Sequence, residues 1–242
     1  MEALYLLISA LILCLPFAYG WLIQVGQFRH RRRWISAASG ASIAYIFVHI
    51  LPELSEQQAA YAEATGRSAF FSEVHVYLAA LVGFIFFFGL YTMAVSSRTA
   101  EHKTDRTHHG GNLAYRLHII AMALNVALIS YLLVDWNKSP RSLFFYTLAM
   151  AFHLLVYDHT LRNEYGSLYD HQGRWLLMTS VFVGWVCGLT ISLPEQVVGA
   201  MVGFVSGGVT INGIRDELPR SGEGRLAPFA LGAAVYSLLL ML

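Results

Sequence analysis

The stretch VVGAMVGFVSGGVTING, residues 197–213, carries no charged side chain. A helix rises 1.5 Å per residue, so about 20 such residues cross the roughly 30 Å hydrocarbon core of a bilayer. Gly199, Gly203 and Gly207 follow one another at intervals of four residues. They therefore share one bare face, along which a second helix can approach closely. The stretch predicts a membrane-spanning helix packed closely inside a helical bundle.

Similar apolar runs recur along the whole chain. Of the 242 residues, 56% are hydrophobic and 13% are charged, about half the charged fraction of ordinary soluble domains. The runs long enough to cross a bilayer are residues 3–27, 34–53, 73–96, 114–136, 142–162, 174–193, 195–214 and 226–242. We therefore expect an all-α integral membrane protein with eight transmembrane helices, in which residues 1–242 form a single transmembrane domain.

The distribution of basic residues predicts how the chain is oriented. If the N-terminus is outside, every Lys and Arg except Arg67, Lys138 and Arg141 falls on a cytoplasmic segment, which is the bias that orients short-loop membrane proteins. We therefore expect both termini outside and a multi-pass location in the cell membrane. The net charge of +1 and the absence of a P-loop or a G-x-G-x-x-G motif give no indication of nucleic acid as a partner.

Polar side chains within the spans carry most of the functional information, because each costs a few kcal/mol at the bilayer centre unless it is paired or hydrated. The candidates are His49 and Glu53 in the second span, His118 and Asn125 in the fourth, and His153, Asp158 and His159 in the fifth. Asn125 and His153 each lie about twelve residues into their spans, so antiparallel helices could bring them together near the midplane.

Each candidate also has a purely structural interpretation. Glu53 and His118 lie near span ends, where they could simply reach the interface. Asn125 could form a hydrogen bond between helices. His153 could be a buried neutral imidazole bonded to a backbone carbonyl. These interpretations stay open beside the functional ones.

The order of these features resembles the ZIP (zinc/iron-regulated transporter-like) family of divalent-metal permeases. The matching features are HILPE (49–53) at the end of the second span, HHGG (108–111) in a loop, and the histidine of the fifth span. The segment LPEQVVGAMVGFVSGGVTINGIRDELPR (193–220) is similar to the family's seventh helix, including its acidic-Leu-Pro ending. The resemblance implies an eight-helix bundle whose fourth and fifth helices hold a metal site.

The resemblance also implies which site residues are missing. The family carries a His-Asn-x-x-Asp pattern on the fourth helix and His-Glu-x-Pro-His on the fifth, and this chain keeps only Asn125 and His153 from them. One imidazole and one amide cannot replace the water that Zn²⁺ or Fe²⁺ sheds, because these ions take four or more ligands. The positions that differ are Leu124, Leu128, Leu154, Val156 and Tyr157.

We therefore expect a weak or rebuilt, partly hydrated metal site. Asp158 adds little in a straight helix, because it points about 140° away from His153. The candidate donors are His153, Asn125, Asp158, His49, Glu53 and His118.

The leading hypothesis is a permease, and not an enzyme, for divalent cations of the zinc and iron class. The ion is expected as a substrate, and the other expected partners are the lipid bilayer and, as an open alternative to a monomer, a second copy in a homodimer. A non-transporting scaffold or partner-binding protein on the same bundle is the second hypothesis. An intramembrane metal-dependent hydrolase is the third, least favoured because the last three spans contain no histidine.

Residues 97–113 are expected to form a cytoplasmic loop that contains histidines. His102, His108 and His109 could bind metal there, or the segment could be a flexible, solvated linker.

Overall fold

The computed structural model describes residues 2–22, 31–52, 55, 70–103, 109–135, 139–217 and 226–241. Every regular element in these ranges is helical, so the expected all-α fold is confirmed for them. The helices are α1 (Glu2–Tyr19), α3 (Arg31–Tyr45), α5 (Phe70–Lys103), α6 (His109–Asp135), α7 (Pro140–Tyr165), α8 (Arg174–Thr190), α9 (Glu195–Glu217) and α10 (Leu226–Met241). Each overlaps one of the eight apolar runs. The π-helical turns η1 (Ile46–Ile50) and η2 (Tyr169–Gly173) follow α3 and precede α8.

Three of the described helices contain segments long and apolar enough to cross a membrane. These segments are Val74–Met93 in α5, Tyr115–Asp135 in α6 and Glu195–Ile214 in α9. Helices α1 and α10 are apolar but shorter. These three helices indicate a membrane protein, whereas the full count of eight crossings and the side on which the termini lie stay predictions.

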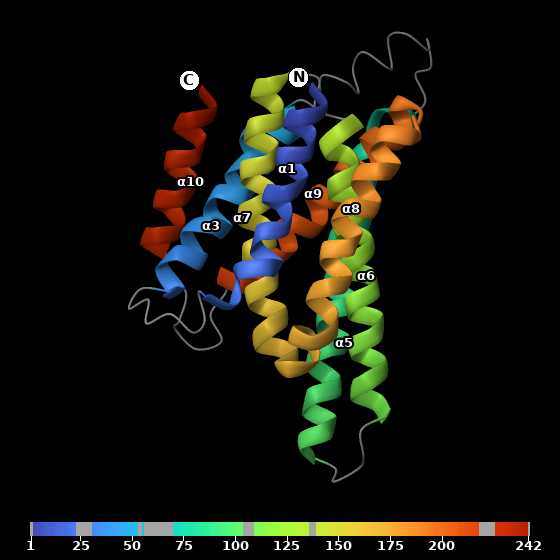
Figure 1. The fold of residues 1–242 in the computed structure, drawn as a ribbon, viewed down its shortest axis with the longest axis vertical. Helices are drawn as coiled ribbons and strands as arrows, with labels where there is room; N and C mark the ends of the chain where they lie inside the picture. Colours follow the sequence, from blue (N-terminus) through green and yellow to red (C-terminus); the bar gives the residue numbers. More distant parts are fainter. Residues whose placement is uncertain are drawn as a thin grey trace.

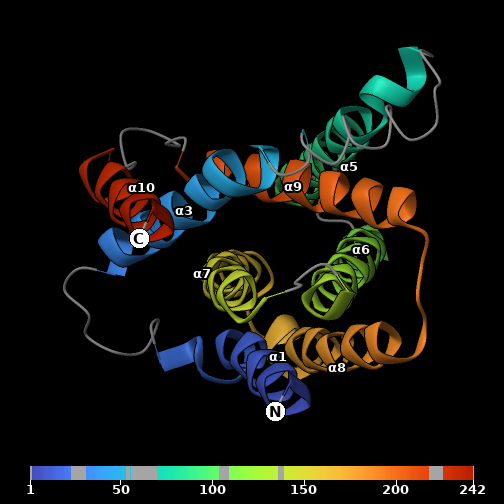
Figure 2. The same ribbon diagram turned by 90° about the horizontal axis from the view of Figure 1, so that it is seen from above.

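The helices form a bundle with two helices in its middle. Figure 2 shows α10, α3, α9 and α5 along one side, α7 and α6 in the middle, and α1 and α8 on the opposite side. The most extensive packing joins α5 to α9, α3 to α10 and α6 to α8. The amino end of α1 and the carboxyl end of α10 lie at the same end of the bundle (Figure 1).

Helix α5 packs against the glycine face of α9. A Cβ on Gly203 would lie 2.5 Å from the carbonyl oxygen of Val76, and a Cβ on Gly207 would overlap the carbonyl oxygen of Ala80. At Gly199 a Cβ would make only an ordinary contact, 3.7 Å from a methyl group of Val76. The backbones of α5 and α9 therefore touch at two of the three glycines.

The pair α3 and α10 repeats the contact between α9 and α5. In each pair, a glycine of the first helix contacts a backbone carbonyl group of the second helix. A glycine of the second helix contacts, in turn, the carbonyl group of the residue three positions before the first glycine. The contacts are Gly40 on Phe229 and Gly232 on Ala37 in one pair, and Gly207 on Ala80 and Gly83 on Phe204 in the other. Two structural units of the same design therefore lie within one chain.

The sequence carries a trace of this repeat. SGASIAYIFVHILP (39–52) and SGGVTINGIRDELP (206–219) place Ser-Gly and Leu-Pro at the same spacing. The glycine that follows the serine in each stretch, Gly40 or Gly207, is the one that meets a backbone carbonyl of the partner helix. Internal structural repeats of this kind are common in membrane transporters.

Candidate functional site

Helix α7 carries most of the candidate residues, and both of its ends are defined. The Ser139 side chain accepts a hydrogen bond from the backbone N–H of Ser142 (3.1 Å), and Pro140 occupies the first turn, where its missing N–H costs nothing. The helix stops at Gly166, whose φ of 52° lies in the left-handed region that glycine tolerates. His153 lies midway between these ends.

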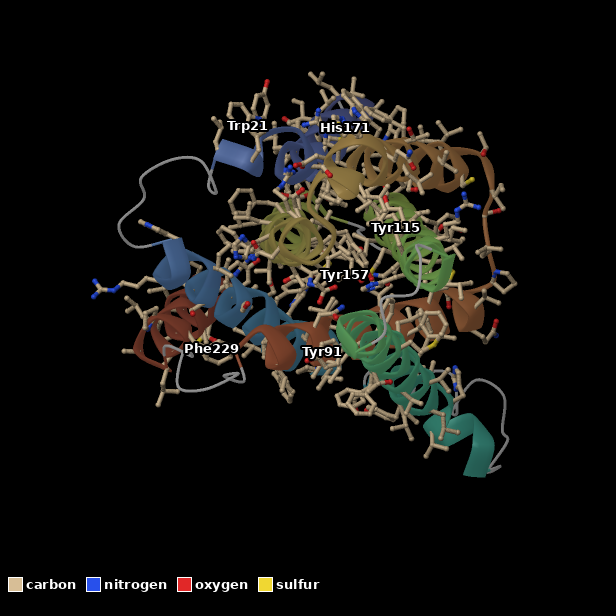
Figure 3. All side chains as sticks on the ribbon, turned by 90° about the horizontal axis from the view of Figure 1, so that it is seen from below. Trp21, Tyr91, Tyr115, Tyr157, His171 and Phe229 are labelled. Atoms are coloured by element: carbon tan, nitrogen blue, oxygen red, sulfur yellow. The ribbon has the colours of Figure 1, made fainter. Side chains whose placement is uncertain are left out.

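His153 faces the interior of the bundle. Its side chain is 3% exposed, and its ring lies 5.0 Å from the ring of Tyr157, centroid to centroid. Tyr146 shares this face of α7; its hydroxyl donates to the carbonyl of Ile129 in α6 (2.8 Å), and its ring meets Tyr45 of α3. Figure 3 shows Tyr157 in the space between α7, α6 and α9. The imidazole therefore belongs to a face of α7 directed at three other helices.

Asn125 is the second interior residue of the predicted site. It is 1% exposed, and neither its amide nitrogen nor its amide oxygen has a hydrogen-bond partner among the described residues. A buried carboxamide without partners loses the free energy of its hydrogen bonds with water. A water molecule or a hydrated ion beside α6 would supply both missing bonds.

A cavity of about 380 Å³ also borders Asn125, between α6, α8 and the pair α5 and α9. Its lining is almost entirely apolar, and Leu124 and Val183 on its wall are 63% and 52% exposed. Exposed apolar side chains such as these can pack against the acyl chains of lipids. The cavity is therefore a groove on the outside of the bundle and not a polar passage through it.

Asp158 points away from His153, as the helix geometry predicts. One carboxylate oxygen accepts hydrogen bonds from Arg162 Nη2 (2.7 Å) and the Tyr169 hydroxyl (2.8 Å), and the other accepts from Arg162 Nε (3.2 Å). The backbone of Gly20 lies directly against this carboxylate. Asp158 therefore joins α7 to η2 and to the residues that follow α1.

Arg162 completes this buried network. Its Nη1 also donates to Asp170 of η2, and its guanidinium lies over the ring of Tyr169. Burial, followed by the charge of Asp158, raises the pKa of Tyr169, so the hydroxyl stays protonated and continues to donate. Sequence reasoning missed Arg162, although its i, i+4 spacing from Asp158 was a usable signal. Nothing in the sequence indicated Tyr169, because its contact depends on the π-helical turn.

The remaining candidates lie on other helices or outside the described residues. His118 is 2% exposed, and its Nδ1 lies 2.6 Å from the Tyr165 hydroxyl and 3.9 Å from a carboxylate oxygen of Glu164. His49 lies in η1 with its ring 5.2 Å from that of Tyr45. Glu53 lies outside the described residues. In the described ranges, no three His, Cys, Asp or Glu side chains come close enough to hold a metal ion together.

The expected loop 97–113 is helical wherever the structure describes it. Helix α5 continues to Lys103 and α6 begins at His109, so His102 and His109 lie in helices. Ala, Glu and Lys, which favour helix, extend α5 beyond its apolar run. His108 lies outside the described residues.

No family model matches this chain, and no curated protein or solved structure matches it either. The likeness to the ZIP family therefore rests on the sequence motifs. A functional assignment rests on the chemistry of the buried polar residues.

Proposed function

We propose that this chain is a ZIP-like membrane permease that passes a partly hydrated divalent cation, of the zinc and iron class, along the face of α7 that carries His153. The observation that carries the proposal is a 3% exposed imidazole in the middle of α7, directed at the interior of the bundle. An ionisable side chain is expensive inside a membrane and usually marks a pathway for ions or protons. Neutral imidazole is also a common ligand of zinc and iron.

The repeated helix pairs support this location. In transporters built from repeats, the substrate site lies near the midplane where the repeats meet. Helices α3 and α9 are the corresponding members of the two pairs, and both contact α7. His153 is thus carried by a helix that lies between the two units.

The roles that follow are simple. His153 supplies a nitrogen ligand, the oxygen of Asn125 is a second donor, and water fills the remaining positions. His118 and His49 are secondary donors, and Glu53, which lies outside the described residues, stays a candidate from the sequence. We assign no ligand role to Asp158, because Arg162 and Tyr169 already occupy its oxygens.

One observation favours the second candidate, a non-transporting scaffold. The described residues contain no cluster of three donors, and the only carboxylate near the middle of α7 is neutralised by Arg162. On that alternative, His153 and Asn125 would serve packing alone.

Uptake of radioactive zinc into cells or proteoliposomes separates the two candidates. We expect His153→Ala to lower uptake by about tenfold or more, because loss of a group that merely orients a metal ligand already costs about 10–100-fold, and His153 is the proposed ligand itself. The matched control is His159→Ala, which removes an imidazole from the same helix, where it bonds to Asn163; this variant should retain uptake. Unchanged uptake by His153→Ala at equal protein abundance, with no metal on the purified protein, would favour the scaffold.

A further inference from the structure

Arg174, at the start of α8, has no anionic partner among the described residues. Its Nε is buried and meets no hydrogen-bond acceptor. Its guanidinium lies over the ring of Trp175, 5.0 Å from the centroid, and that indole is 55% exposed. A cation and an exposed aromatic side chain thus stand together without an acceptor.

The neighbouring network explains why Arg174 lacks a counter-ion. Asp170 precedes Arg174 by four residues, the spacing at which an acidic and a basic side chain pair on an α-helix. These residues instead form a π-helical turn, and Asp170 binds Arg162. The nearest carboxylate along the chain is therefore already engaged.

The position of Arg174 suits an interfacial ligand. The turn that joins α7 to α8 lies towards the end of the bundle opposite the chain ends (Figure 1). This is the side on which the basic residues gather if the termini are outside. Tryptophan favours the headgroup level of a bilayer, and a guanidinium binds phosphate oxygens through two parallel hydrogen bonds.

We propose that Arg174 and Trp175 form a binding site for the phosphate group of an anionic membrane lipid in the leaflet on that side. The guanidinium donates to the phosphodiester oxygens, and the indole packs against the glycerol region and holds the guanidinium in place. The inference rests on the membrane location in the proposed function and is independent of metal transport.

Retention of phosphatidylglycerol by the purified full-length protein, measured by native mass spectrometry in detergent without added metal, tests this site. We expect Arg174→Gln to weaken retention by about tenfold, as loss of a charge-assisted bidentate contact predicts, and Trp175→Leu to weaken it less. The matched control is Arg141→Gln, which also removes an arginine over an aromatic ring, but one that already donates to the carbonyl of Leu240. This control should change retention by less than about twofold.

The outcomes distinguish the phosphate group of a lipid from free inorganic phosphate as the ligand of Arg174. Phosphatidylcholine carries the same phosphodiester but offsets its charge with a choline cation, so it should be retained more weakly than phosphatidylglycerol and should lose less in Arg174→Gln. Inorganic phosphate should not displace phosphatidylglycerol. Equal losses in Arg174→Gln and Arg141→Gln, or full displacement by inorganic phosphate, would overturn the proposal. Zinc uptake by Arg174→Gln is read separately, so a failure of this site does not imply a failure of transport.

Discussion

At the scale of single residues, burial decides what each charged group does. Asp158 is 1% exposed and bonded on both oxygens, whereas the Asp170 side chain is 42% exposed. Both carboxylates hold the same guanidinium. Only Asp158, when removed, leaves Arg162 without its buried partner, and breaking a buried ion pair from one side costs about 3–5 kcal/mol. Helix geometry predicts that Asp158 points away from His153, as observed. The sequence contains no signal that η2 would contact this carboxylate.

We therefore expect Asp158→Asn to destabilise the protein much more than Asp170→Asn. The pair of Arg162 with Asp170 should contribute at most about 1 kcal/mol, because the Asp170 carboxylate is exposed and water screens its charge. Thermal unfolding of both variants in the same detergent, followed by loss of the monodisperse elution peak, measures the difference. Equal shifts of the unfolding midpoint would contradict a dominant role for the buried pair.

At the scale of helices, small residues set how closely the backbones approach. The spacing of Gly199, Gly203 and Gly207 predicts a shared face, but it cannot predict the angle at which the partner crosses. In the structure α5 touches the backbone of α9 at Gly203 and Gly207 and has moved away at Gly199. The crossing angle depends on the side chains of both helices and cannot be predicted from the sequence of one helix alone.

Alanine substitutions at Gly207 and Gly199 test whether the two helices are closer at the first position than at the second. Gly207→Ala should destabilise the bundle, because the new methyl group would overlap the backbone of Ala80 and force α5 and α9 apart. Gly199→Ala is the control, because its methyl group meets Val76 at an ordinary distance. A comparison of their unfolding midpoints in detergent should show a loss for Gly207→Ala only. A larger loss for Gly199→Ala would mean that the contact between α5 and α9 lies elsewhere.

At the scale of the whole molecule, the length and hydropathy of the apolar runs predict the helices. The candidate site depends in addition on how each helix is rotated about its own axis. Each apolar run of the sequence overlaps one α-helix, and the second run continues into the π-helical turn η1, because a backbone shielded from water must satisfy its hydrogen bonds internally. Which donors converge depends on how each helix is turned about its axis, and the sequence leaves this undetermined for α6 and α7. His153 is buried in the interior as expected, while Asp158 and His118 form separate pairs.

On the proposed function, the face of α7 that carries His153 lines a hydrated path. Accessibility of a thiol at this position tests it most directly, in a background in which Cys14 and Cys187 are replaced by serine. The His153→Cys variant should react with a membrane-impermeant thiol reagent, and zinc should slow the reaction. The Leu154→Cys variant, at a neighbouring position that is 0% exposed and turned about 100° away, should stay unreactive. An inert His153→Cys variant, or equal reactivity at both positions, would show that this face of α7 lines no hydrated path.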